Sequence, residues 1–152
     1  MLKIDPIDTR ILAALQTDCD QSLDTLGDTV GLSRNATWRR VRALEEAGVI
    51  TRRVALVDPV KLGLGLHVFM QIRTHSHAPD WQAAFARATR TLPAILSVYR
   101  MTGDLDYLVR ARVRDMADYD QLYQHLIAQV PIADVAASFV MEEIKDSTAL
   151  PV

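Results

Sequence analysis

The chain has 152 residues, of which 49% are hydrophobic and 24% are charged, and its formal net charge is −2. This composition is typical of one globular domain or two small ones. No apolar run reaches the roughly 18 residues of a membrane helix and the N-terminal stretch does not have the pattern of a secretory signal, so we expect a cytoplasmic protein with no membrane partner.

Charge is distributed unevenly along the first third of the chain. Residues 1–33 contain two basic side chains and six aspartates, whereas residues 34–53 contain six arginines and two glutamates. A reversal of this size within an acidic protein indicates a local surface that can bind a polyanion such as DNA.

Three helices are predicted between residues 5 and 47. Asp5 begins the first, Ser22 the second and Ser33 the third, since each can cap a helix N-terminus, and Gly31 supplies the backbone that ends the second helix. Two helices joined by a short glycine-containing turn, with another helix in front, form a helix-turn-helix, whose second helix enters the DNA major groove.

The third helix and the segment after it carry further predictions. Trp38 is expected to lie in the core rather than to stack on a DNA base, because it falls on the apolar stripe of that helix. Residues 49–59 have strand composition and predict a short wing carrying Arg52 and Arg53, and two glycines within residues 60–66 indicate a hinge.

The rest of the chain alternates strands and helices. Strands are predicted at residues 66–74, 94–101, 106–113 and 133–144, with helices at residues 80–92 and from Asp115 to about residue 130, and Gly103 allows a tight hairpin. The order βαββαβ is ferredoxin-like. The predicted fold is therefore α+β: an N-terminal winged helix-turn-helix domain over residues 1–60 and a C-terminal ferredoxin-like regulatory domain over residues 61–152.

Five stretches in this order resemble the Lrp/AsnC, or feast/famine, transcriptional regulators. They are "IDPIDTRILAALQTD", "LGDTVGLSRNATWRRVRALEEAGVI", "VALVDPVKLGL", and the pair "MTGDLDYLVRARVRDMADY" and "SFVMEEIKDST". The resemblance implies a DNA-binding domain, an effector-binding domain that senses an amino acid, and homodimers that assemble into tetramers or octamers. Arg34 and Asn35 stand where many members carry prolines around a threonine, so the base preference of those members is not transferred.

Side-chain chemistry divides the candidate DNA-binding residues into two groups. Arg can bridge guanine O6 and N7, and Asn can bridge adenine N6 and N7, so Arg34, Asn35 and Arg39 are the candidates for base reading. Candidates for phosphate contact are Ser33, Arg40, Arg42, Arg52 and Arg53. The alternative is a solvated face in which these arginines pair with Glu45, Glu46 and the aspartates.

The resemblance places an amino-acid pocket at the loop "TGDLD", completed by the last strand of a neighbouring subunit. An aspartate can hold the ammonium group and backbone amides near a glycine the carboxylate. The candidate residues are Tyr99, Met101, Thr102, Gly103, Asp104, Asp106 and Met116, with Ser138 and Val140 contributed across the interface. Two alternatives remain for this loop: a hairpin turn that binds no ligand, or a site in which Asp104 and Asp106 together bind a divalent metal ion. His75 and His77 form only a weak metal-binding pattern. We therefore expect no metal and no cofactor.

We expect a transcriptional regulator rather than an enzyme, since the sequence contains no nucleophile elbow, P-loop or dinucleotide fingerprint. The resemblance is strongest to a subgroup with cysteine-responsive members, which favours a sulfur amino acid as the effector. The alternative function is an architectural, nucleoid-type DNA-binding protein without an effector.

Overall fold

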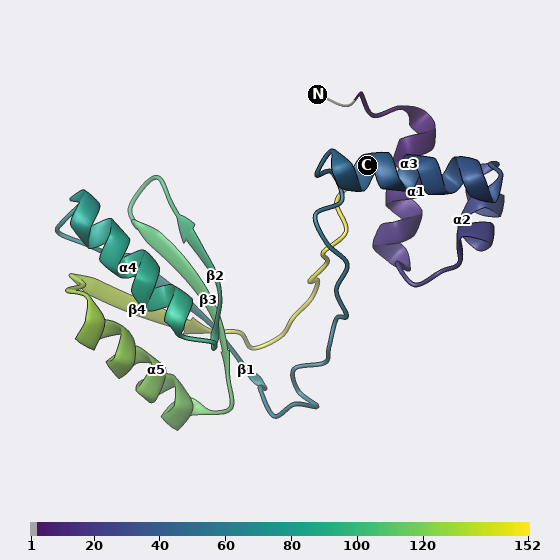
Figure 1. Cartoon of the computed structure of the whole chain (residues 1–152). Coiled ribbons are helices and arrows are strands. Elements are labelled where there is room, and N and C mark those ends of the chain that lie inside the picture. Colours follow the sequence, from purple (N-terminus) through teal and green to yellow (C-terminus); the bar gives the residue numbers. More distant parts are fainter. Residues whose placement is uncertain (1–2) are drawn as a thin grey trace. The chain divides into compact units, whose positions relative to one another are not determined.

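The computed structural model describes residues 3–152 and divides into two compact units. One unit contains the chain up to Leu56 together with Ile144–Val152, and the other contains Val57–Glu143 (Figure 1). Each unit has its own hydrophobic core.

The first unit contains α1 (Pro6–Thr17), α2 (Leu23–Val30) and α3 (Arg34–Glu46). The predicted caps are confirmed: Asp5 and Asp8 form a capping box at α1, while Ser22 and Ser33 accept backbone hydrogen bonds at α2 and α3. Gly31 ends α2 with φ 74°, a left-handed conformation that suits glycine.

These three helices meet in a small apolar core. Its buried members are Ile11, Leu26, Val30, Val41 and Leu44, none more than 5% exposed. The tight turn between α2 and α3 is held by a hydrogen bond from the Leu32 backbone N–H to the Gly27 carbonyl at 2.9 Å, and Leu32 packs against this core. The arrangement confirms the predicted helix-turn-helix.

The segment after α3 differs from the predicted wing. Gly48, with φ 71°, follows the helix, but residues 51–58 contain no strand and none of them is buried. A strand needs a hydrogen-bonding neighbour, and this segment has none within the described chain. Pro59 then begins a turn, closed by a hydrogen bond from the Leu64 N–H to the Pro59 carbonyl at 2.8 Å.

The second unit is a ferredoxin-like βαββαβ fold, as predicted. Its elements are β1 (Leu66–Arg73), α4 (Pro79–Thr91), β2 (Ile95–Arg100), β3 (Tyr107–Val113), α5 (Met116–Gln129) and β4 (Asp134–Phe139). The strands pair antiparallel in the order β2-β3-β1-β4. Both helices cover one face of the sheet, with α4 against β2 and α5 against β3 (Figure 1).

Alternation along the central strands separates the two faces of the sheet. On β3, Val109 and Ala111 are fully buried beneath the helices, whereas Leu108 and Arg110 are only partly buried on the opposite face. We call this opposite side the open face of the sheet. None of the helices in residues 3–152 is long and apolar enough to span a membrane.

Candidate DNA-binding surface and effector site

The exposed side of α3 carries most of the predicted DNA-binding side chains. The exposed residues include Ser33, Arg34, Asn35, Arg39 and Arg42, while the opposite side of α3 packs on α1 and α2. Helical geometry explains this division, because positions four apart repeat on one face. The structure therefore brings these predicted residues together on one surface.

Trp38 contradicts its predicted position. Its side chain is 53% exposed, whereas Thr37, Val41 and Leu44 from the same predicted stripe are at most 5% exposed. Trp38 is one turn from both Arg34 and Arg42, so it lies on the edge of the stripe that turns toward solvent. The apolar pattern alone could not distinguish this edge position from the core.

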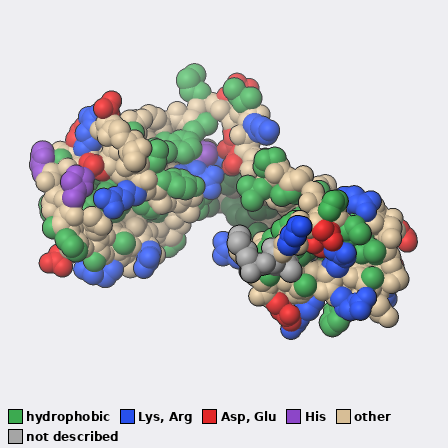
Figure 2. Space-filling view, turned by 90° about the horizontal axis from the view of Figure 1, so that it is seen from above, with side chains coloured by type: hydrophobic (Ala, Val, Ile, Leu, Met, Phe, Trp, Pro, Cys, Tyr) green, Lys and Arg blue, Asp and Glu red, His purple; other side chains and the backbone are tan. Residues whose placement is uncertain are grey.

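Several of the arginines have carboxylate partners. Arg34 pairs with Asp24 at 3.0 Å, Arg42 with Glu46 at 2.8 Å and Arg53 with Glu45 at 3.0 Å. Exposed ion pairs of this kind contribute little to stability and exchange readily for phosphate partners. Basic and acidic side chains are correspondingly interspersed on this unit, on the right of Figure 2.

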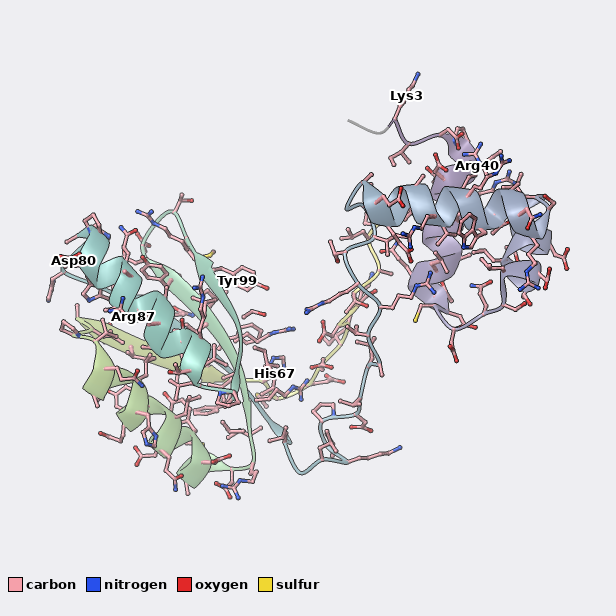
Figure 3. The ribbon with its side chains drawn as sticks, in the orientation of Figure 1. Lys3, Arg40, His67, Asp80, Arg87 and Tyr99 are labelled. Carbon is pink, nitrogen blue, oxygen red and sulfur yellow. The ribbon has the colours of Figure 1, made fainter. Side chains whose placement is uncertain are left out.

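Arg40 has a different environment from the other arginines. Its guanidinium donates to Asp5 and Asp8 at 2.8 Å each, so it connects α3 to the N-terminus of α1 (Figure 3). Hydrogen bonds from the Asp8 backbone and from Arg40 lower the pKa of Asp5, and the two carboxylates raise the pKa of Arg40. Arg40 thus has a structural contact with aspartates, the kind of pairing that the sequence analysis gave as the alternative to DNA contact.

Within residues 3–152, Arg39 and Arg52 have no hydrogen-bonding or ionic partner, and both are exposed. Arg39 lies in the second turn of α3, and Arg52 lies in the extended segment after it. Their guanidinium groups are therefore available to an external anion without the loss of an internal contact.

The predicted effector loop between β2 and β3 is a hydrogen-bonded turn. Gly103 has φ 105°, as the hairpin prediction required, and the Met101 N–H donates to the Asp106 carbonyl at 2.8 Å. The Asp106 carboxylate accepts the Thr74 N–H at 2.8 Å and lies 3.6 Å from His77 Nε2. Asp106 therefore holds the loop, while the carboxylate of Asp104 remains exposed.

The other predicted pocket residues lie at separate places on this unit. Tyr99 and Ser138 are on the open face but on the two opposite edge strands. Val140 donates its N–H to the His67 carbonyl, at the end of the sheet away from the loop, and Met116 follows β3 at that same end. A single chain therefore brings together only the residues from Tyr99 to Asp106.

His67, on the open face of the sheet, belongs to a group of interacting side chains that the sequence analysis missed. The residue is only 7% exposed, and its Nδ1 lies 3.2 Å from Glu143 Oε2, an oxygen that also accepts from Arg112 at 2.6 Å. Burial lowers the pKa of His67, and the charge of Arg112 lowers it further. Figure 3 shows His67 and Tyr99 on the side of the sheet away from α4.

The described side chains form no metal cluster. No group of three or more His, Cys, Asp or Glu residues in residues 3–152 could hold a metal ion. An open hollow of about 540 Å³ lies between α4 and β2 and is lined by Phe85, Thr89, Val98 and Tyr107 among others.

The fold and these surfaces define a class of protein: a DNA-binding regulator in which a helix-turn-helix domain is joined to a ferredoxin-like ligand-binding domain. Comparison with family models agrees. Residues 4–45 match the AsnC-type helix-turn-helix domain, and residues 67–150 match the Lrp/AsnC ligand binding domain. The chain therefore belongs to the Lrp/AsnC family of transcriptional regulators.

Relatives match almost the whole chain. The glutamate uptake regulatory protein of Zymomonas mobilis is 45% identical over 149 residues, covering 98% of this chain and 91% of the relative. The DNA-binding transcriptional activator DecR of Escherichia coli is 43% identical over 150 residues, with 98% and 99% coverage.

Solved structures give the same result. An AsnC family transcriptional regulator from Agrobacterium tumefaciens superposes with a TM-score of 0.94 and 46% identity, covering 97% of this chain and 96% of the other. A transcriptional regulator from Neisseria meningitidis in complex with L-Met has a TM-score of 0.93 and 33% identity, with 98% and 97% coverage.

Proposed function

We propose that this protein recognises specific DNA sites through α3 and responds to an amino acid, with a sulfur amino acid as the first candidate. The observation that carries the DNA part is the exposed row of Arg34, Asn35 and Arg39 at the start of α3, the part of a recognition helix that contacts base edges. The Neisseria relative, found in complex with L-Met, supports the effector class.

The protein would act on DNA as a homo-oligomer in the cytoplasm, and it would have no catalytic activity. A dimer would present two copies of α3 to half-sites separated by about one DNA turn or a multiple of it. The predicted pocket residues that lie far apart in one chain also require a neighbouring subunit to complete the site. The relatives described above are transcriptional regulators, which supports a non-enzymatic function.

For the effector ammonium group, the exposed carboxylate of Asp104 is a better candidate than that of Asp106. Asp106 already accepts the Thr74 N–H, so binding a ligand there would compete with an internal hydrogen bond. The Asp104 backbone carbonyl accepts from Arg73 at 2.8 Å, which fixes the loop and leaves the carboxylate exposed. Tyr99 and Met101, 51% and 39% exposed, can contact an apolar ligand side chain.

The test is a footprinting titration on the DNA upstream of the protein's own gene and its divergent neighbour, with and without a pool of common amino acids. We expect phased protection that shifts with one amino acid. Asp104→Asn should keep the protection and lose the shift, whereas Asp106→Asn, which keeps an oxygen acceptor for Thr74, should retain it. A shift that survives in Asp104→Asn would refute the pocket placement.

Protection without any amino-acid response would favour the second candidate function, an architectural protein that binds DNA without an effector. Arg34, Arg42 and Arg53, which are held by exposed ion pairs, are compatible with this function, since they can contact phosphates irrespective of sequence. Footprints with little sequence preference would support it further.

A further inference from the structure

The most prominent apolar side chain on the recognition surface is Trp38, which none of the DNA-contact predictions includes. It is the only aromatic residue of α3 and lies in the second turn, flanked one turn away by Arg34 and Arg42. At 53% exposure the indole leaves a large apolar surface in water, which is unfavourable for a free protein.

The charge pattern around Trp38 indicates which partner would cover this surface. The part of α3 from Arg34 to Arg42 contains no acidic residue, because Glu45 and Glu46 occupy the last turn. Asn35 and Arg39, three residues before and one residue after Trp38, are exposed, and Arg39 has no internal partner in the described chain. A second copy of this helix would bring arginines against arginines. DNA phosphates could instead bind Arg39 and replace Asp24 and Glu46 as the partners of Arg34 and Arg42.

Within the DNA major groove, one feature matches an indole. Base edges there present hydrogen-bond donors and acceptors, and the only apolar group among them is the C5-methyl group of thymine. Phosphates offer charge, which the surrounding arginines can bind and the indole cannot.

We infer that Trp38 is a specificity-determining residue that reads thymine by packing its indole against the C5-methyl group in the major groove. The inference rests on the proposed function, since it requires α3 to enter that groove. It adds an apolar contact to the hydrogen-bonding contacts expected of Arg34, Asn35 and Arg39. Sites bound by this protein would then carry thymine at a fixed position in each half-site.

Replacement of thymine by uracil tests this contact, because uracil lacks only the methyl group. The probe is a duplex of the most strongly protected segment upstream of the gene, prepared with thymine or with uracil in its place. We expect wild-type affinity to fall about fourfold for each methyl group contacted, from the transfer free energy of one buried methyl or methylene group. Trp38→Ala should bind the thymine duplex more weakly than wild type and show no uracil penalty.

Two variants serve as controls. Arg42→Ala lies on the same face and should weaken binding to both duplexes equally, so its uracil penalty should stay as in wild type. Trp38→Leu keeps an apolar group and should retain part of the penalty. Because Trp38 is exposed, both Trp38 variants should unfold at the wild-type temperature, which a thermal melt checks.

Three outcomes would overturn the inference: an absent uracil penalty in wild type, an undiminished penalty in Trp38→Ala, or a changed oligomeric state of Trp38→Ala with the penalty retained. The last would assign Trp38 to a contact between subunits. These outcomes differ from failure of the proposed function, in which no segment of the upstream DNA is protected at all.

Discussion

Two neighbouring arginines on α3 have different environments and should therefore have different roles. Arg39 is exposed and unpaired within the described chain, whereas Arg40 donates to Asp5 and Asp8 at 2.8 Å each. We expect Arg39→Ala to weaken specific DNA binding by about 5- to 150-fold, the range for one bidentate base contact, and to leave stability unchanged. Arg40→Ala should mainly lower the urea midpoint of unfolding.

The two variants are compared by filter binding at fixed salt and by urea unfolding. Asp8→Asn provides a second way to weaken the Arg40 contact, and it should also lower the midpoint, since Asp8 is a capping-box residue only 7% exposed. If Arg40→Ala lost DNA affinity at unchanged stability, the phosphate contact predicted from the sequence would be its main role.

His67 should make the stability of the ferredoxin-like domain depend on pH. The ordinary pKa of a histidine is 6.5. In the folded state, burial and the charges of Arg112 and Arg110 lower the pKa of His67, and these effects outweigh that of Glu143, which raises it. The unfolded chain therefore takes up a proton near pH 6.5 before the folded chain does. The contribution of His67 to the free energy of unfolding is therefore fully present above pH 6.5. It is lost as the pH falls from 6.5 toward the lowered pKa of the folded state.

The measurement is urea unfolding of the full chain at pH 7.5 and pH 5.5. We expect a lower midpoint at pH 5.5 for wild type and a smaller decrease for His67→Asn, whose amide can replace Nδ1 as the donor to Glu143. His125→Asn is the matched control at an exposed histidine and should keep the wild-type decrease. An equal decrease in His67→Asn would show that other groups cause the pH dependence.

At the scale of elements, the turn between α2 and α3 depends on the absence of a side chain at Gly27. A Cβ there would lie 2.6 Å from the backbone oxygen of Leu32 and 3.1 Å from Thr37 Oγ1. Alanine normally favours a helix over glycine by about 1 kcal/mol, but a backbone oxygen cannot move away without distorting the turn. We expect Gly27→Ala to destabilise the helix-turn-helix by about 1–2 kcal/mol.

Gly65→Ala is the control, because nothing lies within 4 Å of a Cβ at that position. It should change the free energy of unfolding by less than about 0.5 kcal/mol in urea titrations. Stabilisation by Gly27→Ala would mean that the turn tolerates a wider separation of α2 and α3 than the structure has.

Local signals predicted the helices and strands well. Ser22, Ser33 and Gly31 act within a few residues of their own position, so their roles can be read from the sequence. The wing prediction was wrong within the described chain because strand composition does not supply a pairing partner. Trp38 was wrongly placed because a residue at the edge of an apolar stripe can turn to either side.

The candidate sites were less predictable, since they depend on contacts between residues far apart in the sequence. Arg40 lies 35 residues from Asp5, and His67 lies 76 residues from Glu143. No spacing rule connects such pairs. The loop residues Met101 to Asp106 lie together because they are consecutive, whereas Met116 lies at the other end of the sheet.

At the scale of the whole molecule, the chain leaves the first unit after Leu56 and returns to it at Ile144. The returning segment is hydrogen-bonded to α1: Gln16 donates to the Leu150 carbonyl at 3.2 Å and accepts the Leu150 N–H at 2.7 Å. Leu150 and Val152 also line a hollow with Leu12, Leu15 and Val54. The unit that contains α3 therefore includes both ends of the described chain.

This contact predicts that the C-terminal residues stabilise the helix-turn-helix unit. Truncation after Ala149 removes both partners of Gln16 and should lower the stability of this unit by about 1 kcal/mol, the net contribution expected from exposed neutral hydrogen bonds. Hydrogen exchange of the α1 amides, read by mass spectrometry, should become faster. Truncation after Leu150 keeps that residue's N–H and should preserve most of the protection. Equal exchange in the two truncated chains would assign the stabilisation to residues 151–152 instead, and wild-type exchange in both would show that the segment contributes nothing to α1.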